Sequence, residues 1–188
     1  MKISTPRIAF FIGVLCLIGL YFFPMWRISL QVPQYPKDIT IQIWINQIAN
    51  GTKKAMEIMN VLNHNIGMKE INPESIPELR YFPVVLAIII ALGITAGFIK
   101  KNLARNIWIA ILLVALTLAL VDFYLWLYDY GHNLADDAPL VIENSSFQPP
   151  LIGTKKIINF EVASYPLIGV IFPLASIIIT FIAQYKSK

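Results

Sequence analysis

The chain has 188 residues, of which 57% are hydrophobic and only 14% are charged. With a mean hydropathy of +0.65 it is too apolar for an ordinary soluble domain, and integration into a membrane is the economical explanation. A net charge of +4 would suit nucleic acid, but membrane topology explains the placement of the basic residues, so we expect no nucleic-acid partner.

Four apolar stretches are long enough to cross a hydrocarbon layer about 30 Å thick. They cover residues 8–24, 81–99, 107–128 and 165–183. The first stretch lacks a small-residue cleavage site, so we expect it to stay in the protein as an anchor. The sequence therefore predicts an all-α membrane fold with four transmembrane helices.

Basic residues mark one side of the predicted membrane. The flanking residues on that side include no Asp or Glu, and the basic ones are Lys2, Arg7, Lys100, Lys101, Arg105, Lys186 and Lys188. The positive-inside rule then places both termini, with the turn at 100–106, in the cytoplasm. The predicted organisation is a tail and first helix (1–24), an outer domain (25–80), the second and third helices (81–128), an outer loop (129–164), and a fourth helix with its tail (165–188).

The outer segment 25–80 begins with a pattern typical of strands. Apolar residues alternate with polar ones over 27–32, and isoleucines do the same over 39–45. The turn-rich segment 33–38 separates them, which predicts a β-hairpin. A helix that begins at Asp38 is the alternative, because Asp is a good N-cap.

Helical spacing follows in the same segment. Apolar residues recur at 55, 59, 62 and 66, and Thr52 is placed to cap the start. We expect this helix to end between His64 and Gly67, since Asn and Gly tolerate the left-handed conformation that closes a helix. The sequence therefore predicts a small α+β insertion between the first two transmembrane helices.

The outer segment 129–164 reads as an irregular loop, because glycines and prolines interrupt it throughout. Aromatic residues crowd the approach to it, at the depth where amphipathic rings are favoured. They are Phe123, Tyr124, Trp126, Tyr128 and Tyr130.

The two histidines, His64 and His132, stand in the two outer segments and are the best ligand candidates. Met68 follows His64 by four residues, a spacing that brings both side chains to one face of a helix. Imidazole with thioether suits Cu(I), and Met25 is a candidate fourth ligand. The ordinary alternative is that the methionines fill a core and each histidine caps a helix end. Further sulfur could come from two more methionines of the first outer segment, Met56 and Met59.

Acidic residues offer weaker candidates. Asp122 is the ionisable residue within a predicted span, which makes it a functional hypothesis unless a polar partner near the interface satisfies it. Asp129 begins an acidic set, but this set lacks the spacing of a calcium loop and is better explained as a solvated face. The set continues with Asp136, Asp137 and Glu143. Asn144-Ser145-Ser146 matches a glycosylation sequon, a pattern short enough to arise by chance. No catalytic motif is visible, so we do not expect an enzyme.

Four blocks carry a resemblance that covers most of the chain. They are Pro33-Gln34-Tyr35-Pro36, the segment 63–68, the segment 126–134 and the segment 148–153. Together they resemble a family of small bacterial membrane proteins associated with copper-chaperone and nitrous oxide reductase maturation genes of Bacteroidota. The resemblance implies a bacterial inner membrane, a role in copper maturation, and His64, Met68 and His132 as ligands, with Asn63, Gly67, Asp129 and Gly131 shaping the turns. The family often carries Gly-Met before the last block, where this chain has 144–147 instead.

Three functional hypotheses follow. The leading one is an accessory protein in the lipid bilayer that binds or relays Cu(I) outside the membrane, during maturation of a periplasmic copper enzyme, for a periplasmic or membrane protein partner. The second is a structural or scaffold subunit of a larger membrane complex, which docks through its first outer segment. The third is a small transporter that uses Asp122.

Overall fold

The computed structural model describes residues 5–135, 138–139 and 146–187. In this part of the chain three helices are long and apolar enough to span a membrane. They are α3 (Glu78–Phe98), α4 (Asn102–His132) and the helix formed by η3 (Ile168–Val170) with α5 (Ile171–Tyr185). A shorter apolar helix precedes them, formed by α1 (Thr5–Cys16) and the 3-10 turn η1 (Leu17–Tyr21). The chain is therefore a membrane protein whose apolar helices contact the lipid bilayer.

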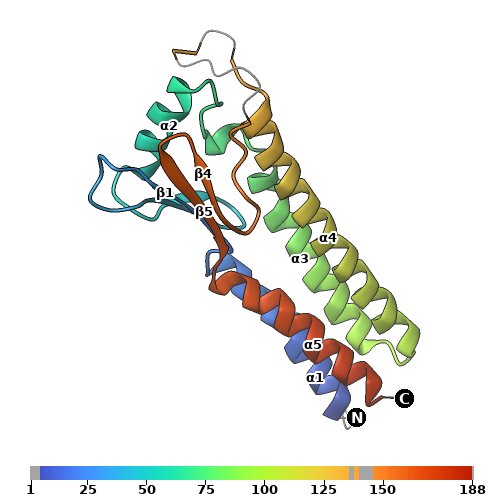
Figure 1. Cartoon of the computed structure of the whole chain (residues 1–188). Coiled ribbons are helices and arrows are strands. Elements are labelled where there is room, and N and C mark those ends of the chain that lie inside the picture. The colour runs from blue at the N-terminus through green and yellow to red at the C-terminus, as the bar shows by residue number, and fades with distance from the viewer. Residues whose placement is uncertain (1–4, 136–137, 140–145, 188) are drawn as a thin grey trace.

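The helices pack around a hydrophobic core of their own. Trp108 fills its centre, where its Nε1 donates a hydrogen bond to the carbonyl of Ile89 over 2.7 Å. Along the α1–α5 contact, Gly13 lies against Ser176 and Thr180, and these small residues let the two backbones approach closely. Close packing thus joins the first and last helices side by side (Figure 1).

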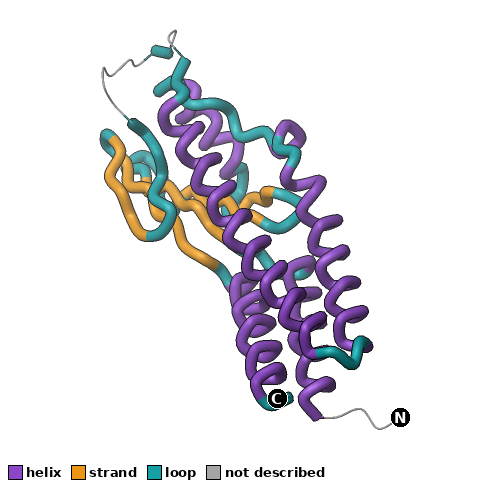
Figure 2. The backbone as a smooth tube through the Cα atoms, turned by 90° about the vertical axis from the view of Figure 1, so that its right-hand side faces the viewer, coloured by secondary structure: helices purple, strands orange, loops and turns teal. Residues whose placement is uncertain are grey.

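A five-stranded antiparallel sheet of order β3-β2-β1-β5-β4 makes the fold mixed rather than purely helical. Its strands are β1 (Trp26–Gln31), β2 (Ile39–Ile43), β3 (Ile48–Asn50), β4 (Gly153–Ile157) and β5 (Phe160–Pro166). β1 pairs with β2 on one side and with β5 on the other, so that Ile28 lies opposite both Ile41 and Ser164. The strands gather alongside the part of the molecule that lies away from both termini (Figure 2).

The predicted hairpin over 27–45 is confirmed, and the alternative helix that begins at Asp38 is wrong. The prediction that 129–164 is irregular is also wrong, because β4 and β5 form a second hairpin there. The segment 25–80 is consequently no separate domain: its three strands share one sheet with β4 and β5. The predicted fourth span begins too early, since Tyr165 belongs to β5.

Helix α2 (Ala55–Asn65) confirms the predicted helix and covers one face of the sheet. Its start differs from the prediction. Lys54 is the N-cap residue, and the Asn50 side chain accepts a hydrogen bond from the backbone N–H of Met56 over 2.7 Å. The hydroxyl of Thr52 instead accepts from the backbone N–H of Thr40 over 3.0 Å, so Thr52 joins the helix entry to β2.

Helix α4 packs against the other helices in its N-terminal half and against the sheet at its C-terminal end. Its 31 residues extend about 46 Å, longer than the roughly 30 Å of hydrocarbon that a span must cross. Its last turns leave the helix core and pack against the sheet through Phe123, Trp126, Leu127 and Tyr130. This packing carries the helix past the predicted end at Tyr128. We call the sheet, α2 and these last turns of α4 the sheet domain.

Candidate functional site

The candidate site lies where α2 and α4 both end. α2 closes with paired hydrogen bonds: the N–H of Met68 donates to the carbonyl of Asn63 over 2.9 Å, and the N–H of Gly67 donates to that of His64 over 3.3 Å. Gly67 has φ +77°, the left-handed conformation that such a closure requires. The predicted helix end between His64 and Gly67 is therefore confirmed.

Three contacts join this turn to the end of α4. The N–H of Ala135 donates to the carbonyl of Gly67 over 2.8 Å. Lys69 Nζ and Asp129 Oδ2 form an ion pair at 2.7 Å. The hydroxyl of Tyr130 donates to the carbonyl of Glu70 over 3.0 Å. Segments that are about 60 residues apart in the sequence thus form one surface, which we call the tip.

A third segment completes the tip. The N–H of Phe147 donates to the carbonyl of Gly131 over 3.0 Å, and the Phe147 ring is buried in the core of the sheet domain. A Cβ on Gly131 would lie 2.2 Å from the Cα of Gln148, so only glycine admits this approach. Residues of the segments 63–68, 126–134 and 148–153 therefore meet at the tip, while the segment 33–36 lies at the β1–β2 turn.

His64 and His132 are both exposed at the tip, each in the last turn of its helix. His132 therefore lies in the last turn of α4, so the predicted loop at this position is wrong. Its ring stacks on Tyr128 with centroids 4.0 Å apart, and its Nδ1 lies 3.0 Å from the carbonyl of Tyr128. A carbonyl only accepts, so in the neutral ring Nδ1 is the protonated nitrogen and Nε2 is the one with the lone pair.

The two methionines predicted as ligands pack against hydrophobic cores. Met68 is half-buried and packs into the core of the sheet domain, where it lines an apolar cavity of about 50 Å³ together with Met59 and Trp126. Met25 packs with the helix core, and its backbone pairs with Ile43 at the junction of helices and sheet. The four predicted ligands are thus divided: two imidazoles on the tip, one thioether in each core.

The carboxylate of Asp129 at the tip has a structural role, because it pairs with Lys69. The hydrogen bond from Lys69, offset in part by burial, holds the pKa of Asp129 below its usual range. Burial, followed by the field of Asp129, raises the pKa of the Tyr130 phenol and keeps it a donor at neutral pH. Among the described residues, no three His, Cys, Asp or Glu side chains form a metal-binding group. The other acids considered for calcium, Asp136, Asp137 and Glu143, lie outside the described residues, as do Asn144 and Ser145 of the sequon.

Asp122 lies half-buried on α4. Glu78, the first residue of α3, is near enough to act on it electrostatically. The two ion pairs among the described residues involve neither of these carboxylates. Asp122 is thus level with the start of α3, near the sheet domain, and this position suits an interface residue better than a central relay group.

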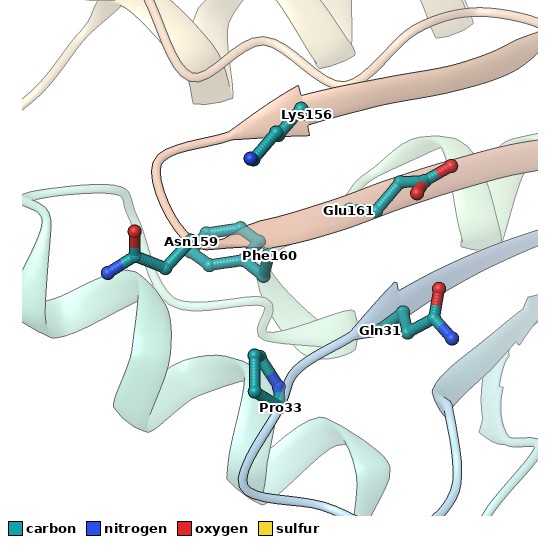
Figure 3. Close-up of a pocket in the computed structure, with 6 residues that line it drawn as sticks. All are labelled: Gln31, Pro33, Lys156, Asn159, Phe160 and Glu161. Carbon is teal, nitrogen blue, oxygen red and sulfur yellow. The ribbon is translucent and has the colours of Figure 1, made fainter.

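A separate hollow opens on the sheet near the β4–β5 turn (Figure 3). Its volume is about 380 Å³, and its lining residues are Gln31, Pro33, Lys156, Asn159, Phe160 and Glu161. Lys156 and Glu161 are exposed cross-strand neighbours on β4 and β5. Among these lining side chains no nucleophile is paired with a base.

Sequence reasoning missed the two side chains that hold the tip together, Lys69 and Tyr130. Lys69 follows the glycine turn directly, and Tyr130 is one of the crowded aromatics that interface anchoring already explained. Their pairing depends on a contact between distant segments, which no local pattern reports. Comparison with protein-family models, curated proteins and solved structures found no match to this chain.

Proposed function

We propose that the chain spans a bacterial inner membrane four times, with both termini in the cytoplasm and the sheet domain outside. The helix Thr5–Tyr21 reaches the lower end of the length range for a span, roughly 17 residues, and it packs along α5. Basic residues at the end opposite the sheet domain support this orientation.

We propose further that the tip binds Cu(I) between His64 and His132 and passes it to a periplasmic or membrane protein partner. The supporting observation is the joining of the two histidine segments: each histidine stands three residues before one member of the Gly67–Ala135 hydrogen bond. Imidazole is a good copper ligand, and in the neutral tautomer protonated at Nδ1 the Nε2 atom of His132 is available to bind. The role is a binding one and involves no catalysis.

The proposed ligand set is smaller than the one that the sequence predicts. Met68 and Met25 each contribute to a core, so recruiting either thioether would expose apolar surface and cost stability. A site of two exposed imidazoles remains. Such an open site suits relay, because a partner can reach the metal without unfolding the tip.

Anaerobic loading of the purified protein with Cu(I), followed by metal analysis, tests this proposal. The wild type is expected to retain near-stoichiometric copper, and the double variant His64→Ala with His132→Ala is expected to lose it. Asn65→Ala and Asn133→Ala are matched controls, because each alters a neighbouring tip residue and leaves both imidazoles in place. Substoichiometric copper that is unchanged in the double variant would refute copper binding.

A second candidate, a docking subunit of a larger complex, is favoured by the other face of the sheet. That face carries polar and small side chains on its central strands, among them Arg27, Ser29, Thr40 and Gln42. Arg27 lies over the ring of Tyr165, 5.6 Å from its centroid. Co-purification of a partner that survives both histidine substitutions and is lost with Arg27→Glu would favour docking over copper relay.

A further inference from the structure

The end of the molecule opposite the sheet domain gathers basic side chains from the ends of the helices. Both termini and the turn between α3 and α4 lie there (Figure 1). We call it the basic end, and its described basic residues are Arg7, Lys100, Lys101, Arg105 and Lys186. Both ion pairs of the described residues, those of Glu57 and Asp129, belong to the sheet domain. The described carboxylates therefore leave this positive charge unneutralised.

Arg105 is the buried member of the set, with 3% of its surface exposed. Its Nε donates to Gln184 Oε1 over 2.9 Å, and its Nη1 donates to the carbonyl of Ile99 over 3.4 Å. Its Nη2 donates to Asn102 Oδ1 and, over 3.5 Å, to the hydroxyl of Ser187. All four acceptors are neutral. Hydrogen bonds thus fix the guanidinium in place, but no anion among the residues that the structure describes balances its charge.

Helix dipoles do not remove this imbalance. α3 and α5 end beside Arg105, and their carbonyl ends carry partial negative charge. α1 and α4 begin at the same end, however, and their N–H ends carry partial positive charge of similar size. Arg7 is also close enough to repel Arg105. The described residues of the basic end therefore carry a net positive field, and burial strengthens the field of Arg105 because the local dielectric is low.

Exposed apolar side chains surround this charge. Those nearest in sequence to the basic residues are Phe98, Ile99, Leu103 and Tyr185, which are 66%, 43%, 64% and 76% exposed. A free phosphate ion would make no use of these surfaces. A phospholipid would use both, with acyl chains along the apolar side chains and the phosphate against the cations.

We propose that the basic end binds the headgroup phosphate of an anionic phospholipid. The exposed amines of Lys100 and Lys101 contact the phosphate, and Arg105 adds its field from between the helix ends. Basic pockets between transmembrane helices recognise lipid headgroups through this combination of charge and apolar contact. The inference is independent of the copper proposal, since it involves the opposite end of the molecule.

Thermal unfolding in mixed micelles tests the proposal. The purified protein is titrated with phosphatidylglycerol or with phosphatidylcholine of the same acyl chains, and inorganic phosphate at equal concentration forms a third arm. The double variant Lys100→Gln with Lys101→Gln is compared with Lys53→Gln and Lys54→Gln, which remove the same charge from the sheet domain and leave the basic end unchanged.

We expect phosphatidylglycerol alone to raise the unfolding midpoint of the wild type. The rise should be smaller at high salt and should be mostly lost in the Lys100/Lys101 variant but kept in the Lys53/Lys54 variant. Equal stabilisation by the two lipids, or an equal loss in the two double variants, overturns the proposal. Stabilisation by inorganic phosphate that matches that by phosphatidylglycerol also overturns it, because the site would then bind the free anion.

Discussion

At the scale of single residues, the tip depends on two glycines with different roles. Gly67 supplies the left-handed conformation that ends α2, at φ +77°. Gly131 lies within α4, where glycine is a poor helix former, and is required because the backbone of Gln148 passes directly over it. Gly67 is needed for its backbone conformation, and Gly131 is needed because it has no side chain.

Replacement of Gly131 by alanine should destabilise the sheet domain, although alanine is the better helix former. The new Cβ would lie 2.2 Å from the Cα of Gln148, so the segment that carries Phe147 must shift. Overpacking of this kind costs about 1–3 kcal/mol or more. Denaturant unfolding monitored by tryptophan fluorescence would measure the loss, with Asn133→Ala as a surface control. A variant as stable as the control would show that the segment is not packed against α4.

The Lys69–Asp129 ion pair gives the tip a pH dependence. The folded-state pKa of Asp129 is depressed, so its stabilising contribution is present above the unfolded pKa near 3.8 and is lost as the pH falls through the folded pKa. Both side chains are about half exposed, at 47% and 49%, so the effect is small and screened by salt. The unfolding midpoint of Asp129→Asn should lie slightly below that of the wild type at pH 7 and converge with it in strong acid. A difference that persists unchanged in strong acid would contradict this origin.

Sequence patterns predict part of this site. The Asn-x-Ile-Gly stop of α2 follows from conformational preference, and the exposure of both histidines follows from their polar neighbours. The packing of the half-buried Met68 side chain against the core does not follow. Met68 stands after a chain reversal that points it back at the sheet, so its helical spacing from His64 no longer places the two side chains together.

At the scale of elements, the first hairpin could be predicted and the second could not. The isoleucines of β2 alternate cleanly, whereas β5 places Ser164 inward and Tyr165 outward. Ser164 is fully buried because its hydroxyl accepts a hydrogen bond from Trp26 Nε1 over 2.8 Å and donates to the carbonyl of Leu151 over 3.0 Å. A hydrogen-bonded serine at a buried position interrupts the alternation of apolar and polar residues on which strand prediction depends.

Because β1 pairs with β5, two cysteines introduced at facing positions of these strands should form a disulfide that links the two outer segments. Ser29 and Ala163 are register partners, and Cα atoms of antiparallel partners lie about 4.5–5.5 Å apart, within disulfide range. In a Cys16→Ser background, Ser29→Cys with Ala163→Cys should oxidise to an intramolecular crosslink, seen as faster migration on a non-reducing gel.

Ser29→Cys with Thr154→Cys is the matched control. Thr154 pairs with Ala163 on the far side of β5, so it lies two strands from Ser29. Adjacent strands are about 4.8 Å apart, which puts this control pair near 10 Å and beyond disulfide reach. Efficient crosslinking of the control, or none of the register pair, would contradict the strand order.

At the scale of the whole molecule, the length of the apolar helices and the placement of charged residues determine the overall arrangement. Three helices of sufficient length and a shorter fourth could be predicted from hydropathy, and basic residues without acidic neighbours mark the end of the molecule that carries both termini. The union of the two outer segments in one sheet could not be predicted, because strand pairing between segments more than 100 residues apart leaves no local signal.

The proposed orientation predicts opposite accessibility of two lysine positions. In the Cys16→Ser background, Lys53→Cys in the sheet domain should react with a membrane-impermeant maleimide on intact spheroplasts. Lys101→Cys at the basic end should react only after the membrane is permeabilised. Labelling of both positions before permeabilisation, or the reverse pattern, would contradict an arrangement with both termini in the cytoplasm.

The central claim is that His64 and His132 hold one Cu(I) together, and a double-mutant cycle of Cu(I) affinity tests it most directly. Affinities would be measured by competition with a chromophoric chelator for the wild type, His64→Ala, His132→Ala and the double variant. Shared coordination predicts that either single substitution lowers the affinity nearly as much as both together, since one remaining imidazole cannot hold the ion. Additive losses from the two substitutions, or unchanged affinity in the double variant, would contradict a shared site at the tip.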